Sequence, residues 1–174
     1  MKTVKILGDN MSYDYENIEQ IKQLKYRYCR GIDSCNIEEL GRVFTDDARI
    51  NYQGGSYTFE AEGKENILTA MKFAFHDKLV SCHTVHMPII EITGDTTAKG
   101  QWRLLDYAMN LAEDNKVTVG GAEYVDDYAK NADGVWQIKQ SAYTRVYEQV
   151  FLQDDHNLTH YQLGGGVVKG EFSI

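Results

Sequence analysis

The stretch SCHTVHMPIIEITGDTTAKGQWRLLDY (81–107) decides the fold class, because it contains two long β segments joined by a tight turn. β-branched and aromatic residues dominate on both sides of Gly94-Asp95, and short connections between long strands are typical of antiparallel pairing. The same composition and recurring turn residues continue to about residue 150. The sequence therefore predicts an antiparallel meander of four strands over 81–93, 96–111, 117–131 and 134–150.

Before this meander, apolar residues recur at helical spacing instead of at every second position. Ile18, Ile21, Leu24 and Tyr28 lie on one side of a predicted amphipathic helix. Further turn and capping residues divide the rest into two shorter helices and two short strands. The helices are expected over 15–31, 36–44 and 64–75, and the strands over 48–52 and 56–60. Three helices that precede a sheet indicate an α+β fold, with the helices packed on one sheet face.

The overall composition limits the class of protein. The chain has 174 residues, a formal net charge of −8 and 43% hydrophobic residues. A chain of this length can bury a sizeable core as one domain without a disulfide or a metal. Its acidic charge argues against nucleic acid or an anionic membrane as the main partner. Three cysteines without CxxC spacing, and a start without an apolar segment, favour the cytoplasm.

Strand alternation assigns two charged residues to faces of the predicted sheet. Asp106 falls in phase with Trp102 and Leu104, and burying an unpaired carboxylate costs several kcal/mol. Asp106 is therefore expected to have a partner or a raised pKa. Arg145 falls in phase with Tyr143 and Tyr147, on the face opposite to Trp136, Ile138, Ala142 and Val146.

The histidines of the first long strand are expected on opposite faces. His83 falls in phase with Val85, Met87 and Ile89, whereas His86 falls in phase with Ile90 and Ile92. A zinc site built on this HxxH spacing is not expected, because the two rings would point apart. A β-bulge would move every residue beyond it to the opposite face, and alternation alone does not reveal where a bulge occurs.

Several segments, taken in order, carry a family resemblance. These are IEQIKQLKYRYCRGID (18–33), IEELGRVFTDDARINY (37–52), the stretch 81–107, and GGAEYVDDYAKNADGVWQIKQSAYTRVYE (120–148). Together they resemble the SnoaL-like branch of the nuclear-transport-factor-2-like superfamily. Within it they are most similar to bile-acid 7α-dehydratase and more distantly to scytalone dehydratase and hexachlorocyclohexane dehydrochlorinase. The resemblance implies a cone: three N-terminal helices on a strongly curved, mainly antiparallel sheet. The resemblance covers about 15–150, and since no linker or repeat interrupts the chain, one domain is expected over 1–174, with a core of about 15–150, an arm 1–14 and an extension 151–174.

The resemblance also implies site residues. The tyrosine and aspartate that close the first helix in the bile-acid dehydratase pattern match Tyr28 and Asp33. The histidine after the third helix matches His83, and the strand aspartate matches Asp106. Residues expected to contact substrate are Tyr52, Arg145, Trp102, Leu104, Met87 and Tyr143.

These residues predict dehydration of a hydroxylated carbonyl compound, steroid-like or polyketide-like, without a cofactor or a metal. His83 would take the proton next to the carbonyl, with Asp106 or Asp33 orienting its ring, and Tyr28 would donate to a substrate oxygen. An isomerase, an aldol cyclase or a dehydrohalogenase on the same cone remains open. So does a non-catalytic small-molecule-binding or assembly module. The expected partners are a small apolar hydroxylated substrate and further copies of the chain, as a trimer or dimer.

Overall fold

The computed structural model describes residues 14–76 and 78–153, and the fold is given for these residues. Nearly all of the expected N-terminal arm and C-terminal extension lies outside them. The helices are α1 (Tyr15–Asp33), α2 (Ile37–Val43) and α3 (Lys64–Ala74). The strands are β1 (Phe44–Gln53), β2 (Thr58–Glu62), β3 (Leu79–Gly94), β4 (Thr97–Asn110), β5 (Lys116–Lys130) and β6 (Trp136–Leu152). This order of elements is the one that the sequence predicts.

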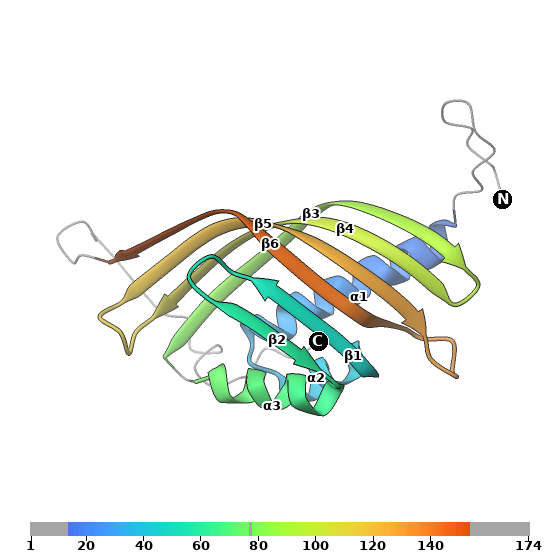
Figure 1. Ribbon diagram of the computed structural model, residues 1–174, viewed down its shortest axis with the longest axis horizontal. Helices are drawn as coiled ribbons and strands as arrows, with labels where there is room; N and C mark the ends of the chain where they lie inside the picture. The colour runs from blue at the N-terminus through green and yellow to red at the C-terminus, as the bar shows by residue number, and fades with distance from the viewer. Residues whose placement is uncertain (1–13, 77, 154–174) are drawn as a thin grey trace.

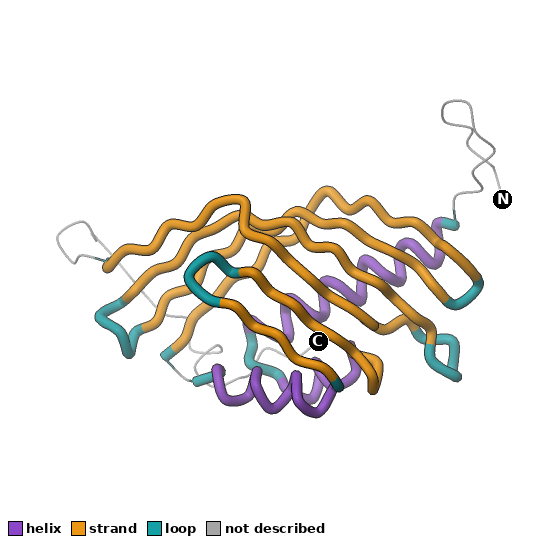
Figure 2. The backbone as a smooth tube through the Cα atoms, viewed as in Figure 1, coloured by secondary structure: helices purple, strands orange, loops and turns teal. Residues whose placement is uncertain are grey.

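The strands form one mixed sheet in the order β2-β1-β6-β5-β4-β3. Strands β3 to β6 form the expected antiparallel meander, and β1 extends it by pairing in parallel with β6. Figure 1 shows the sheet arching over α1, while α3 lies beneath the β1–β2 hairpin. The tube in Figure 2 shows the same two layers, with the helices on one side of the sheet. The predicted α+β cone is therefore confirmed.

Local signals explain where α1 begins and which side it buries. The Asp14 side chain accepts a hydrogen bond from the backbone N–H of Asn17, which caps the first turn. The stripe that contains Ile21 and Tyr28 is buried against the sheet, as predicted, and it also contains Lys25. None of the helices in the described part of the chain is long and apolar enough to cross a membrane.

A β-bulge in β3 corrects the predicted faces of that strand. The pairing with β4 shifts between His86 and Ile89, and Met87 has a positive φ of 50°. Met87 is consequently 73% exposed on the outer face, and Ile89 is exposed with it. Ile90 packs against the core instead. The expectation that Met87 and Ile89 share the face of His83 is wrong, as is the one that pairs Ile90 and Ile92 with His86.

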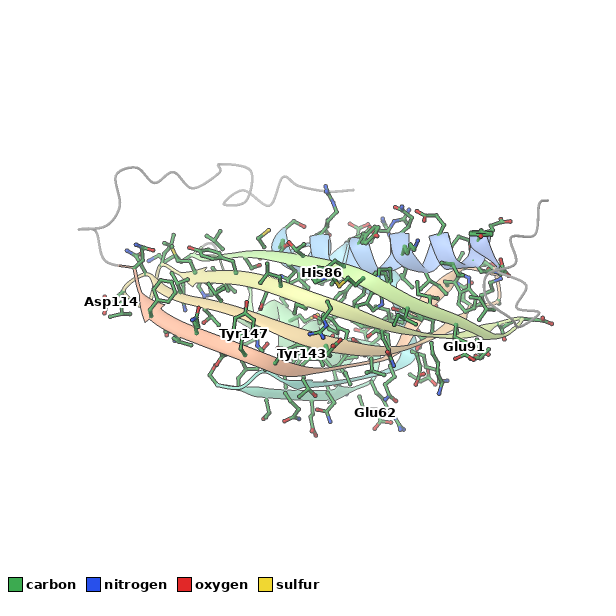
Figure 3. The ribbon with its side chains drawn as sticks, turned by 90° about the horizontal axis from the view of Figure 1, so that it is seen from above. Glu62, His86, Glu91, Asp114, Tyr143 and Tyr147 are labelled. Atoms are coloured by element: carbon green, nitrogen blue, oxygen red, sulfur yellow. The ribbon has the colours of Figure 1, made fainter. Side chains whose placement is uncertain are left out.

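Strand β6 contains two similar irregularities, on either side of Tyr143, which is labelled with Tyr147 in Figure 3. The first, between Ile138 and Gln140, brings Trp136 and Ile138 onto the same buried face as Tyr143. The second, between Arg145 and Tyr147, turns the Tyr147 ring outward, where it lies against Gly121. The expectations that Trp136 and Ile138 oppose Tyr143, and that Tyr147 shares its face, are therefore both wrong.

Candidate active site

A cavity of about 450 Å³ lies between α1, α3, the β1–β2 hairpin and the inner face of the sheet. Its walls are mainly aromatic and aliphatic, with side chains such as Phe59, Met71 and Phe75. The polar groups are the imidazole of His83 and a set of phenols from Tyr28, Tyr52, Tyr57, Tyr124 and Tyr143. An apolar cavity of this size with a few convergent polar groups is typical of a small-molecule site.

His83 is held by the carboxylate of Asp33, the last residue of α1. Its Nδ1 lies 2.6 Å from Asp33 Oδ1, and its backbone N–H donates to Oδ2 at 2.8 Å. The Ser81 hydroxyl also donates to Oδ1 at 2.8 Å. Because Nδ1 is engaged, Nε2 is the ring nitrogen available to a ligand. The question of which aspartate pairs with His83, open in the sequence, is thereby answered: Asp33 does.

The pKa of Asp33 lies below its ordinary value. Burial alone would raise this pKa, but the hydrogen bonds from His83 and Ser81 favour the charged form more strongly. Asp33 is therefore a carboxylate at neutral pH, and it can stabilise a positive charge on the imidazole of His83.

Two buried phenols meet on the other side of the cavity. The hydroxyl oxygens of Tyr28 and Tyr52 are 2.7 Å apart, and the Tyr52 ring stacks on Tyr143 at a centroid distance of 4.7 Å. Tyr124 packs edge-on against all three rings. Burial raises the pKa values of Tyr28, Tyr52 and Tyr124 above the usual range of a phenol. These groups remain protonated at neutral pH and can donate hydrogen bonds.

Asp106 forms a bidentate ion pair with Arg145, which confirms the prediction that this carboxylate has a partner. Arg145 Nη1 and Nη2 donate to the two carboxylate oxygens at 2.5 and 2.9 Å. Burial would lower the pKa of Arg145, but Asp106 outweighs it and leaves the pKa raised. A Cβ on Gly120, the β5 residue opposite Asp106, would lie 2.6 Å from Arg145 Nη1, so a glycine leaves room for this pair. Neither charged residue lines the cavity, although Asp106 pairs with His83 in the strand register.

The structure brings some predicted residues together and separates others. Tyr28, Tyr52, Tyr143 and His83 meet at the cavity, with Asp33 behind the histidine. Four predicted residues lie elsewhere on the inner side: Asp106, Arg145, Trp102 and Leu104. The last two are buried in the core, where Trp102 donates to the Tyr128 hydroxyl. Met87 lies on the outer face, away from the cavity.

A second charged pair, between Lys25 and Asp126, was not predicted. Lys25 Nζ lies 2.8 Å from Asp126 Oδ2, and both side chains are completely buried. The hydroxyls of Tyr128 and Ser141 donate to the two oxygens of Asp126 at 2.7 Å each. The ammonium makes no directed hydrogen bond among the described residues and lies 3.4 Å from the Tyr124 ring centroid.

Signals for this pair were present in the sequence. Lys25 is spaced by four residues from Ile21 and by three from Tyr28 on the buried helical stripe. Asp126 is in phase with Tyr124 and Tyr128 on one face of its strand, as Asp106 is with Trp102 and Leu104.

Within 14–76 and 78–153, no group of three or more His, Cys, Asp or Glu residues is placed to hold a metal ion. The chemistry that the site offers is that of a histidine base with an anionic partner. It faces an apolar cavity that also contains neutral phenol donors. Such an arrangement can remove a proton from carbon while the phenols bind a nearby oxygen.

Comparisons with known proteins agree with the fold. The family model for the SnoaL-like domain matches residues 14–142. A candidate scytalone dehydratase from Novosphingobium aromaticivorans superimposes with a TM-score of 0.70 at 17% identity, covering 80% of this chain and 90% of that one. Hexachlorocyclohexane dehydrochlorinase LinA type 2 gives 0.70 at 18% identity, over 86% and 95% of the two chains. LinA type 3 from Novosphingobium barchaimii gives 0.64 at 18% identity, over 78% and 90%.

Proposed function

The chain belongs to the SnoaL-like domain family, and from this premise we propose that it is a lyase acting without a cofactor. Its proposed reaction removes water from a small, mainly apolar, hydroxylated carbonyl compound. One observation carries this proposal: the His83–Asp33 pair and the Tyr28–Tyr52 phenols border the same apolar cavity.

His83 is the proposed base. Its Nε2 takes the proton from the carbon next to the carbonyl, or from the equivalent vinylogous carbon of an enone, while Asp33 fixes the tautomer through Nδ1 and stabilises the imidazolium that forms. The C–O bond then breaks, and the imidazolium returns the proton to the departing hydroxyl. The net change is one new carbon–carbon double bond and one molecule of water. A positioned base of this kind contributes roughly 10²–10⁴-fold to the rate.

The phenol pair is the proposed oxygen-binding group. Tyr28 and Tyr52 have two hydroxyl hydrogens, and their mutual bond uses only one of them. Where Tyr52 donates that bond, the Tyr28 hydrogen is available to a substrate carbonyl or to the departing hydroxyl, where it stabilises developing negative charge. Asp106 and Arg145 enter the proposal as positioning residues, because their ion pair connects the strand beside His83 to β6.

A dehydrohalogenase is the second candidate. A His–Asp base removes a proton next to a leaving group whether that group is hydroxide or halide. Two of the superimposed structures are named as dehydrochlorinases. The identity of the released group separates the two candidates.

The test compares two β-hydroxy or vinylogous β-hydroxy ketones, 3-hydroxy-1-tetralone and a 7-hydroxy-3-oxo-4-ene steroid. We expect the wild type to convert at least one of them with the loss of water, measured by mass spectrometry. His83→Ala should lower kcat by about 10²- to 10⁴-fold. His86→Ala is the matched control, because His86 is an exposed histidine on the outer side of the same strand (Figure 3).

Two results would count against the proposal. Loss of halide from a chlorinated cyclohexane, with neither ketone dehydrated, would favour the dehydrohalogenase. Full activity of a folded His83→Ala protein would remove the proposed base.

A further inference from the structure

The turn between β1 and β2 contributes one aromatic residue, Tyr57, to the cavity. Tyr57 is 46% exposed, whereas Tyr28, Tyr52, Tyr124 and Tyr143 are all buried. A lining residue that is also open to solvent lies at the mouth of a cavity. Tyr57 therefore occupies the place where a ligand enters or protrudes.

The Tyr57 ring is folded back over its own turn. A Cβ placed on Gly54 would lie 2.4 Å from the ring, so the ring rests directly on the Gly54 backbone. The N–H of Gly54 also donates to the Tyr57 carbonyl at 2.8 Å. Any larger residue at position 54 would displace the ring, so the position of Tyr57 depends on Gly54.

Two side chains of β6 form hydrogen bonds with the backbone of this turn. Glu148 Oε2 accepts a hydrogen bond from the Ser56 N–H at 2.9 Å. Arg145 Nε donates to the Gly54 carbonyl at 3.3 Å, while its other nitrogens hold Asp106. The turn is thus tied to the strand that also carries Tyr143 of the cavity wall.

The phenol of Tyr57 is electrostatically coupled to charged groups from two strands. Arg145 and Glu148 of β6 and Asp106 of β4 all act on it electrostatically. Although the residue is 46% exposed, partial burial of its phenol raises the pKa of Tyr57 to about 12, so its hydroxyl is neutral under ordinary conditions. The positive charge of Arg145 is already engaged by Asp106, which leaves the neutral aromatic ring as the part of this turn that a ligand meets.

We propose that Tyr57 is a specificity-determining residue that limits the size of ligand the cavity accepts, and that Glu148 is the positioning residue that holds it there. This inference rests on the proposed role of the cavity as a substrate site. The ligands it concerns are neutral fused-ring ketones. We expect a two-ring ketone to fit within the cavity and a four-ring ketone to reach its mouth, where it meets the Tyr57 ring.

Binding of unreactive ketones tests this inference without relying on turnover. The dissociation constants of 1-tetralone and of a 3-oxo-4-ene steroid without the hydroxyl are measured by titration calorimetry. We expect Tyr57→Ala to change the ratio of the two constants by about 10-fold in favour of the steroid. Tyr147→Ala is the matched control, since Tyr147 is 47% exposed and also rests on a glycine, but on the outer face.

Variants of Glu148 test the positioning role. Glu148→Gln keeps an oxygen for the Ser56 N–H and should keep the wild-type ratio. Glu148→Ala removes that acceptor and should shift the ratio in the same direction as Tyr57→Ala. A ratio that is unchanged in Glu148→Ala would overturn the role of Glu148.

The remaining outcomes separate this inference from the proposed function. Retained binding with an unchanged ratio in Tyr57→Ala would overturn the inference alone. An equal loss of affinity for both ketones would also overturn it, because Tyr57 would then be a general contact. If the wild type bound neither ketone, the inference and the proposed function would fall together. Binding without dehydration of the hydroxylated substrates would overturn only the proposed function.

Discussion

Two pairs of ionisable side chains connect α1 to the sheet in the described part of the chain, and they differ mainly in their exposure. Asp33 pairs with His83 of β3 at 2.6 Å, and Lys25 pairs with Asp126 of β5 at 2.8 Å. The side chains of the first pair are 24% and 18% exposed, while those of the second are fully buried. In both pairs, hydroxyl groups donate further hydrogen bonds to the carboxylate.

The difference shows that a close pair of ionisable side chains does not by itself mark a reactive site. A ligand and water can reach His83 because it lines the cavity, so its protonation state can change during a reaction. Lys25 lies against the Tyr124 ring with no access to solvent, so removing its charge would leave Asp126 unpaired in the core. The first pair can take part in chemistry, whereas the second supports the packing beneath it.

The largest expected effect tests the buried member of this comparison. Lys25→Met should lower the free energy of unfolding by about 3–5 kcal/mol, because it leaves a carboxylate buried without its counter-charge. Urea denaturation monitored by circular dichroism measures this. Lys22→Met is the control, since Lys22 is partly exposed on the same helix, and we expect a change within about 0.5 kcal/mol.

The double variant Lys25→Met/Asp126→Leu sharpens the same test. Apolar replacement of both charges should restore part of the lost stability, because it removes the unpaired charge but leaves the Tyr128 and Ser141 hydroxyls without their acceptor. A single variant as stable as the wild type would show that water reaches this pair, and the contrast with His83–Asp33 would disappear.

Two serine hydroxyls allow the two carboxylates to be compared directly, with a smaller expected loss of stability. Ser141→Ala removes a hydrogen bond to the fully buried Asp126 and should cost about 1–3 kcal/mol. Ser81→Ala removes one to the partly exposed Asp33, where water can take its place, and should cost about 0.5 kcal/mol. Equal losses in unfolding experiments would contradict the assignment of one carboxylate to the core and the other to the cavity.

A further expected effect is a pH dependence at the cavity. Because the pKa of Asp33 is lower in the folded state, Asp33 stabilises the protein above the ordinary carboxyl pKa of about 4. This contribution, about 1 kcal/mol for a partly exposed pair, is lost as the pH falls through the lowered pKa. Unfolding curves of wild type and Asp33→Asn should therefore converge towards acid pH. Parallel curves over that range would show that Asp33 does not lower the free energy through its charge.

Much of the fold was predictable because its signals are local. Helical spacing located α1, and alternation placed Asp106 correctly on the buried face. Tyr28 and Asp33 were assigned through the resemblance, since no local pattern marks them as more than a core residue and a turn residue. Their meeting with Tyr52 and His83 depends on contacts between distant segments.

The errors arose where one extra residue enters a strand. A bulge at Met87 needs a positive φ in a residue that is not glycine, and no composition rule signals such a conformation. Strict alternation along the strand ignores this bulge, and it therefore places Met87 on the wrong face. Lys25 was missed for a different reason: a lysine is ordinarily assigned to the surface, even when its spacing places it on a buried stripe.

The parallel pairing of β1 with β6 has a consequence for how the chain is made. Phe44 pairs with Ile138, and Tyr52 with Tyr143, so an early strand depends on β6, the last strand of the described residues. As the polypeptide leaves the ribosome, β1 has only its β2 hairpin partner until β6 has been synthesised. The aromatic wall of the cavity therefore closes late in folding, because long-range pairing is slow. Until then β1 presents an unpaired edge to other nascent chains and to chaperones.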